Sequence, residues 1–167
     1  MGQDDILFYA DSGSEFIENM DDFFCLQQNL KQDIVIFQLE HIEREFTKAD
    51  AFLLMQCDWQ RCKDTPQFSA SFISLMKTFE TAEFVGEWLT YVQDSRIITP
   101  QESIFAVNPR NFKEHRHDQS VLSILAKKWG VEAWPDISQY GQEGTLRFDQ
   151  KFETINKNFI AHTRNKE

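Results

Sequence analysis

The chain has 167 residues and a net charge of −10, and 41% of its residues are hydrophobic. This length suits one domain with a real core, and so acidic a balance argues against a nucleic acid or an anionic membrane surface as partner. No apolar run is long enough to span a bilayer. The N-terminal residues also lack the basic region and the apolar stretch of a signal peptide, so a cytoplasmic location is expected by default.

Short apolar runs predict the strands. The first, residues 6–10, is apolar on both faces, so we expect it in the centre of a sheet and not at its edge. Two more strands are expected at residues 33–39, which read DIVIFQL, and at residues 68–73, where phenylalanine and alanine alternate with serine. Residues 101–108, which lie between prolines, are either an edge strand or a loop.

Apolar residues at helical spacing predict the helices. We expect helices at residues 16–30, at residues 47–55 with Thr47 as N-cap, at residues 81–93, and at residues 121–129 before a closing Gly130. The pattern weakens after Gly130, and residues 145–167 are expected to form a polar C-terminal tail. Strands that alternate with helices favour an α/β architecture in a single domain over residues 1–167.

Cysteine and tryptophan usage adds two expectations. The three cysteines have an odd count and ordinary spacing, which indicates reduced thiols and not a disulfide framework. Trp88 and Trp129 lie on apolar helical faces and are expected in the core. Trp134, beside Pro135 in an expected loop, is the tryptophan most expected at the surface.

The run HRHDQS, from His115 to Ser120, is the most informative stretch of the sequence. Two imidazoles bracket a guanidinium, and an acid and an amide follow directly before an expected helix. Backbone N–H groups point outward at a helix N-terminus, so a polar cluster there can hold a sugar or a phosphate. The alternative is structural: Asp118 or Ser120 caps the helix, and the histidines are ordinary surface residues.

Asp11 closes the first expected strand, in the run YADSG. Ligands of α/β sheets bind at the carboxyl ends of strands, which makes Asp11 a candidate site residue. The alternative is that Asp11, Ser12 and Gly13 form only a turn.

The longer run EHRHDQSVLSILAKKWG resembles a signature of glycosyltransferase-like proteins, which are nucleotide-sugar transferases of the GT-A type. The same set carries blocks similar to DDILFYADSG, TKADAF and FVGEWL, which occur here at residues 4–13, 47–52 and 84–89. The blocks stand in the same order and span most of the chain. The resemblance implies a GT-A-like mixed sheet flanked by helices, and transfer of a sugar from a nucleotide-sugar donor to a glycan or other acceptor.

The resemblance also implies roles for single residues. Asp11 matches the first acid of the Asp-x-Asp motif that helps to hold Mn²⁺ or Mg²⁺ on the sugar diphosphate, although Gly13 stands where the second acid would be. Asp118 and Gln119 match an Asp-Gln pair that faces the donor sugar, and they are the expected catalytic residues.

Substrate-binding and further metal-binding roles follow from the same resemblance. His115, Arg116 and His117 are expected to neutralise the diphosphate or to fix their loop, and Ser12 is expected beside the donor. GT-A enzymes often supply a late histidine to the metal or the diphosphate, which makes His162 the second expected metal ligand. A lone histidine in a polar tail is, however, more often only solvated.

The position of the YADSG block qualifies the expected function. In GT-A transferases a nucleotide-binding βαβ half precedes this block. We therefore expect the chain to match the C-terminal portion of such an enzyme, and an incomplete or inactive fragment is one form that this could take. A non-catalytic interaction or glycan-binding domain is the second hypothesis. A metal-dependent phosphohydrolase that uses Asp11 with His115 and His117 is the third.

Overall fold

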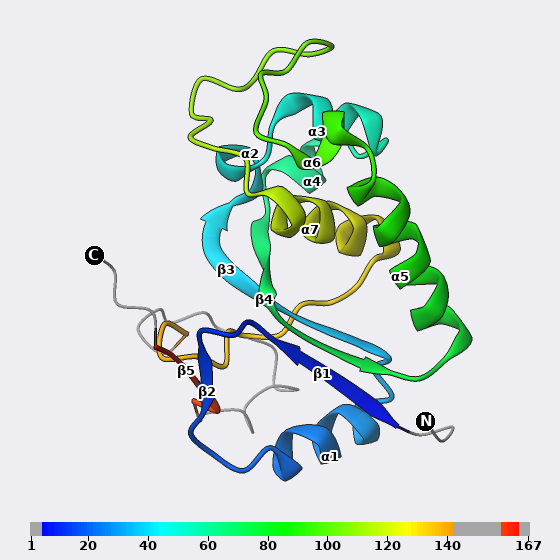
Figure 1. Cartoon of the computed structure of the whole chain (residues 1–167), viewed down its shortest axis with the longest axis vertical. Helices are drawn as coiled ribbons and strands as arrows, with labels where there is room; N and C mark the ends of the chain where they lie inside the picture. Colours follow the sequence, from blue (N-terminus) through cyan, green and yellow to red (C-terminus); the bar gives the residue numbers. More distant parts are fainter. Residues whose placement is uncertain (1–4, 142–157, 164–167) are drawn as a thin grey trace.

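The computed structural model describes residues 5–141 and 158–163 as a mixed α/β fold with two small antiparallel sheets. Figure 1 shows how the elements are arranged. The strands are β1 (Ile6–Ala10), β2 (Ser14–Phe16), β3 (Ile34–Ile42), β4 (Pro66–Met76) and β5 (Ile160–His162). The helices are α1 (Asp21–Leu30), α2 (Glu43–Phe46), α3 (Ala49–Leu54), α4 (Gln60–Lys63), α5 (Phe79–Val92), α6 (Ser95–Ile98) and α7 (His117–Trp129).

The larger sheet has the strand order β1-β4-β3, so β4 lies in its centre and β1 at its edge. The expectation that residues 6–10 form a central strand is therefore wrong for the part of the chain that is described. The apolar composition suggested burial on both faces, yet Leu7 and Tyr9 are 46% and 47% exposed while their neighbours along the strand are half-buried. One face of β1 is thus packed, and the other is open.

Two apolar clusters hold the sheet and the helices together. The first lies between the sheet and the helices α3, α5, α6 and α7, and includes Phe68 and Ala70 of β4 with Ile124 and Leu125 of α7. The second cluster packs α1 against the opposite face of the sheet and has Phe23 at its centre. Figure 1 shows α5 and α7 on one side of the sheet and α1 on the other.

Trp134 belongs to the second cluster, and its expected surface position is wrong. The residue is fully buried, and its indole N–H donates to Gln32 Oε1 at 2.7 Å. Its backbone also pairs with β3, because its N–H donates to Ile36 and its carbonyl accepts from Gln38. The Trp-Pro pair indicated a loop correctly, but this loop passes along the edge of β3.

The two long helices after β4 form where they are expected. α5 begins at a capping box in which the Thr78 and Thr81 side chains each bond to the backbone of the other residue. α7 ends at Gly130, which adopts the left-handed conformation with φ of 69°. The expected helix at residues 47–55 is shorter, because Thr47 does not cap it and α3 starts after Lys48.

The N-terminal and C-terminal parts depart further from expectation. Residues 16–30 split into the end of β2 and the separate helix α1, and β2 pairs with β5 in the second sheet. β5 falls within the expected polar tail, where Phe159 and Ile160 are buried, while residues 142–157 and 164–167 lie outside the described residues.

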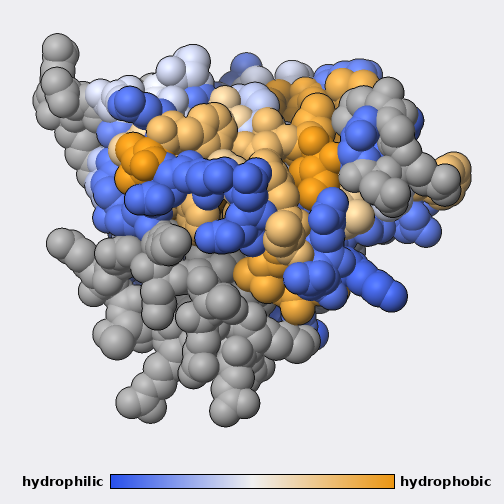
Figure 2. Space-filling view, turned by 90° about the horizontal axis from the view of Figure 1, so that it is seen from below, coloured by the Kyte–Doolittle hydropathy of each residue, from blue (hydrophilic) through white to orange (hydrophobic). Residues whose placement is uncertain are grey.

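Apolar side chains also reach the surface. Figure 2 views the molecule from the side on which Figure 1 shows α1, and apolar residues lie there between groups of hydrophilic ones. Phe16 and Ile17, which follow the turn after β1, are each about half exposed. Among the described helices, none is long and apolar enough to cross a membrane.

Candidate functional site

The HRHDQS run is fixed to the rest of the fold by its backbone and by Ser120. The Ser120 hydroxyl donates to the Phe46 carbonyl at 2.7 Å and accepts from the Arg116 N–H at 3.0 Å. Arg116 is the N-cap residue of α7, and its own side chain makes no capping hydrogen bond. Within the described residues, the exposed Asp118 carboxylate in the first turn accepts no hydrogen bond from the helix N-terminus either.

His115 and Arg116 are engaged by the protein itself. His115 is 5% exposed, and its Nδ1 accepts from the Lys48 N–H at 3.3 Å. Burial, with the nearby Lys48 charge, lowers the pKa of His115 to about 4, so the imidazole is neutral at pH 7. The Arg116 guanidinium lies 3.9 Å from the Phe46 ring centroid and pairs with Glu114 at 3.0 Å. Both side chains contribute to positioning α7.

His117, Asp118 and Gln119 continue the run toward the surface. His117 and Asp118 are exposed, and His117 takes a left-handed backbone conformation with φ of 46° at the start of α7. Gln119 is half-buried, and its amide donates to Gln67 Oε1 at 2.9 Å on β4. This bond fixes the Gln119 side chain in the first turn of α7, next to Asp118.

Asp118 lines a pocket of about 700 Å³ between α5 and the sheet. Its floor is formed by strand residues from β1 and β4, and its wall by Val85 and Trp88 of α5. Leu7 and Tyr9 lie opposite Leu75 and Ile73 in the strand pairing, and all four line the floor. The pocket is of the size and largely apolar character typical of ligand sites.

Asp11 lies at the end of β1, where the sheet is irregular. Its N–H donates to the Ser71 carbonyl at 2.9 Å, and the pairing of β4 with β3 shifts register between Val35 and Phe37 nearby in the ladder. The Asp11 carboxylate accepts from the Tyr9 hydroxyl at 2.8 Å. Tyr9 also lines the pocket that Asp118 lines, so residues of the YADSG and HRHDQS blocks border one hollow.

His162 is brought to the same turn from the far end of the chain. It lies opposite Ser14 in the second sheet, and the next residue, Thr163, donates its N–H to the Gly13 carbonyl at 2.8 Å. The His162 ring packs beside Phe72 and stacks on Tyr140, with centroids 5.0 and 5.6 Å away. Ser12 is exposed in this turn. The residues expected to bind metal thus come from two different sheets: Asp11 follows β1, and His162 lies in β5, which pairs with β2 beyond the turn.

Sequence reasoning missed a buried polar network behind Gln119. Glu43 is fully buried, accepts hydrogen bonds from Thr47, Gln67 and Ser123, and pairs with Lys127 at 2.7 Å. In the sequence Glu43 is one acid among several in LEHIERE, with no signal of burial. Gln67 links this network to Gln119, so it supports the N-terminal turn of α7 from below.

The TKADAF block has a structural role that the sequence did not reveal. The Asp50 carboxylate accepts from the backbone N–H groups of Ile104, Phe105 and Ala106 at 2.7 to 3.0 Å. The expected edge strand or loop at residues 101–108 is a loop, and Asp50 holds it against α3. Since Lys48 also bonds His115, this block and the HRHDQS block pack together.

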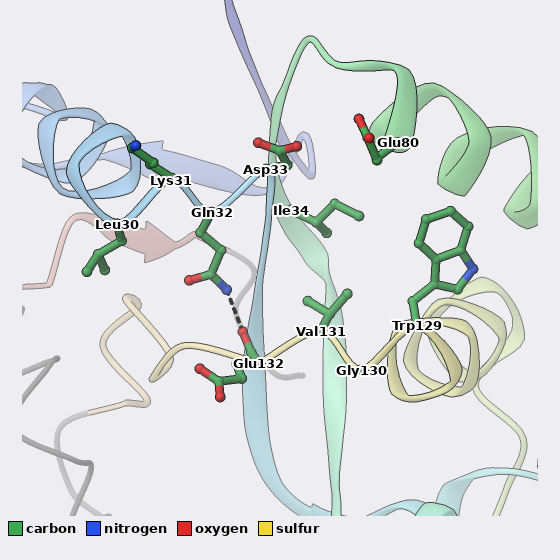
Figure 3. A pocket seen from close by; sticks show the side chains of 10 residues that line it. All are labelled: Leu30, Lys31, Gln32, Asp33, Ile34, Glu80, Trp129, Gly130, Val131 and Glu132. Atoms are coloured by element: carbon green, nitrogen blue, oxygen red, sulfur yellow. Dashed lines mark hydrogen bonds between the residues drawn. The ribbon is translucent and has the colours of Figure 1, made fainter.

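A second pocket, of about 450 Å³, lies where the segments after α1 and α7 meet (Figure 3). Gln32 donates to the Glu132 carbonyl at 2.8 Å across it, and Asp33, Glu80 and Trp129 line its sides. It shares no lining residue with the pocket at Asp118.

Comparisons of the chain with protein-family models, with curated proteins and with solved structures found no match. The class that the fold itself defines is therefore the mixed α/β class with antiparallel sheets.

Proposed function

We propose that this chain is a GT-A-like domain of a nucleotide-sugar glycosyltransferase, with its site at the surface shared by Asp11, Tyr9 and Asp118. The observation that carries the proposal is the position of Tyr9, whose hydroxyl bonds Asp11 and whose side chain lines the pocket with Asp118. The two blocks that resemble transferase signatures are far apart in the sequence, but Tyr9 of one and Asp118 of the other line the same pocket. Their proximity supports a common site.

Asp118 and Gln119 take the roles nearest to the reacting sugar in this proposal. The exposed Asp118 carboxylate, which caps no helix, stabilises positive charge that develops at the anomeric carbon. Gln119 donates its amide N–H to Gln67, and its oxygen is then oriented to accept from a sugar hydroxyl. His117 is the exposed imidazole beside them and contacts the donor, whereas His115 and Arg116 position the helix.

Asp11 is the residue that would hold Mn²⁺ or Mg²⁺, and it would supply a single carboxylate ligand to the cation. Among the described residues no group of three or more His, Cys, Asp or Glu side chains converges on a metal site. A hard cation at Asp11 would therefore take most of its oxygen ligands from the diphosphate and from water. When bound, such a cation neutralises diphosphate charge, and His162 and Ser12 lie in or beside the same turn.

A binding measurement tests the donor site. Calorimetric titration of nucleotide diphosphates and nucleotide-sugars in the presence of Mn²⁺ should show that Asp11→Asn removes the metal-dependent part of binding. Asp5→Asn removes the same charge at the other end of β1 and should leave binding unchanged. Equal binding by the parent chain and the Asp11 variant, with and without Mn²⁺, would exclude Asp11 from the donor site.

The non-catalytic interaction domain remains the second hypothesis. The internal engagement of His115 and Arg116 favours it, because two of the expected substrate-binding side chains already have protein partners. It predicts that the same titrations show no nucleotide-dependent heat at any Mn²⁺ concentration.

A further inference from the structure

Within the described residues, the outer edge of β1 carries backbone groups that pair with no other strand. Asp11 donates its N–H to Ser71, and Lys77 donates its N–H to Asp5, so the odd-numbered residues of β1 face β4 in the antiparallel ladder. Ile6, Phe8 and Ala10 therefore direct their N–H and C=O groups away from the sheet. Among the described residues, none of these groups bonds to another strand.

The apolar pocket lies directly beside this edge. Leu7 and Tyr9 point to the α5 side of the sheet and are about half exposed, and the hollow continues over Ile73 and Leu75 to Val85. An open strand edge next to exposed apolar side chains is a template for strand pairing, which proteins normally cover or block. β1 has no proline, bulge or lysine that would block it.

The charges at the two ends of β1 indicate which strand fits. Asp5 precedes the strand and Asp11 follows it. If two copies paired antiparallel around Phe8, Asp5 of each copy would lie opposite Asp11 of the other. If they paired parallel and in register, Asp5 would lie beside Asp5 of the other copy, and Asp11 beside Asp11. Like charges in facing positions destabilise a strand pair, and the net charge of −10 adds general repulsion between copies. A second copy is thus disfavoured.

We propose that the outer edge of β1 binds an extended segment of another polypeptide, with alternating apolar residues and a lysine or arginine at each end. The segment would extend the three-stranded sheet at β1, bond to Ile6, Phe8 and Ala10, and place apolar side chains over Leu7 and Tyr9. Its basic ends would face Asp5 and Asp11. With this strand in place β1 is interior, which accounts for its fully apolar sequence. The edge shares Tyr9 and Asp11 with the proposed transfer site, but the strand pairing does not rest on the transfer chemistry, because it is measured without a nucleotide-sugar.

Amide hydrogen exchange with a synthetic peptide tests the strand pairing directly. The probe is the blocked peptide Lys-Thr-Val-Thr-Val-Thr-Lys added to the full chain, in which the lysines and valines share the face of Asp5, Leu7, Tyr9 and Asp11. In the free protein the amides of Ile6, Phe8 and Ala10 should exchange fast, and those of Leu7 and Tyr9 slowly. Saturating peptide should slow exchange at the first three by about tenfold or more, as expected for newly paired strand amides. Unchanged exchange at millimolar peptide would overturn the proposal.

Matched variants separate edge pairing from general apolar binding. Ala10→Pro removes one outward N–H without touching the β4 ladder, and Leu7→Lys adds a charge in the hollow. Both should weaken peptide binding about tenfold or more, with folding checked by circular dichroism. Leu89→Lys, at a more exposed α5 residue outside the pocket lining, should bind like the parent. Equal affinities in all variants would contradict the proposal, and so would self-association of the free chain that Leu7→Lys abolishes.

Discussion

Glu43 is a buried acid that joins α2 to β4 and α7. Its carboxylate is fully buried, and Lys127 is the cation that pairs with it in the described residues, with 8% of its side chain exposed. A buried ion pair adds little net stability, but removal of one partner leaves an uncompensated buried charge. Because Gln67 joins Glu43 to Gln119, the same network also supports the candidate site.

Lys127→Met should therefore destabilise the protein strongly. We expect a loss of about 3–5 kcal/mol in the free energy of unfolding, measured by urea denaturation. Lys128→Met is the control, because Lys128 pairs with the partly exposed Glu87 and should cost about 1 kcal/mol or less. Combining Lys127→Met with Glu43→Gln should recover part of the loss. A cost for Lys127→Met as small as that of Lys128→Met would show that Glu43 is not charged in the core.

Because His115 is buried and neutral, we expect the free energy of unfolding to decrease at acidic pH. Burial lowers the pKa of His115 to about 4 in the folded state from its ordinary value of 6.5, so the unfolded chain binds more protons between these two pH values. Stability from this group is full above about pH 6.5 and falls as the pH drops toward 4, by a total on the order of 3 kcal/mol.

His115→Asn keeps an acceptor for the Lys48 N–H but cannot titrate. Denaturant unfolding at pH 6.5 and at pH 4.5 should show a smaller difference for this variant than for the parent chain. Burial lowers the pKa of His41 as well, so His41→Asn serves as the comparison at a more exposed histidine. An identical pH dependence in the parent chain and in the His115 variant would exclude His115 as the source.

At the scale of the elements, two glycines on neighbouring helices should respond oppositely to the same change. Gly130 follows α7 with φ of 69°, and Gly86 lies inside α5; a Cβ added at either meets no atom within 4 Å. Backbone conformation alone then decides the effect. Gly130→Ala should cost about 1 kcal/mol, and Gly86→Ala should add up to about 1 kcal/mol, in thermal or urea unfolding. If both variants changed the free energy of unfolding in the same direction, backbone conformation would not be what decides the effect at these two glycines.

The elements that sequence reasoning predicted well are those with strong local signals. α5 and α7 have regular apolar spacing, and Gly130 marks the end of α7. β3 and β4 were predicted as strands but are longer than expected, because sheet pairing extends beyond the apolar run. The central position expected for β1 failed because strand order depends on contacts that one strand does not encode.

The candidate site was predictable residue by residue but not as an arrangement. The sequence singled out Asp11 and Asp118, yet it could not show that Tyr9, which bonds Asp11, lines one pocket with Asp118, because that depends on how α7 and β1 are placed by β4. In the sequence, nothing distinguishes the buried His115 and the engaged Arg116 from the exposed His117. Only the contacts of His115 with Lys48 and of Arg116 with Phe46 show their structural role. Burial of Trp134 and pairing of His162 beside Gly13 likewise arise from long-range contacts.

For the molecule as a whole, the described chain combines a packed core with one open surface. The core lies on both sides of β4, and the open surface runs along β1 from Asp11 to the apolar hollow. The proposed transfer site and the proposed strand-binding edge both involve this surface. A segment bound at the edge would border the pocket that Asp118 lines, so it would complete one wall of the site.

The most direct test of the proposed transferase is Asp118→Asn in the full-length protein. Asn keeps the size of the side chain, and Asp118 makes no capping bond, so stability should change by about 1 kcal/mol or less. Steady-state transfer or hydrolysis of the nucleotide-sugar, measured with saturating Mn²⁺, should fall on the order of a hundredfold or more with little change in donor affinity. Gln119→Ala and His117→Ala should have smaller effects, mainly on binding. Equal turnover in the parent and the Asp118 variant would contradict the proposed site.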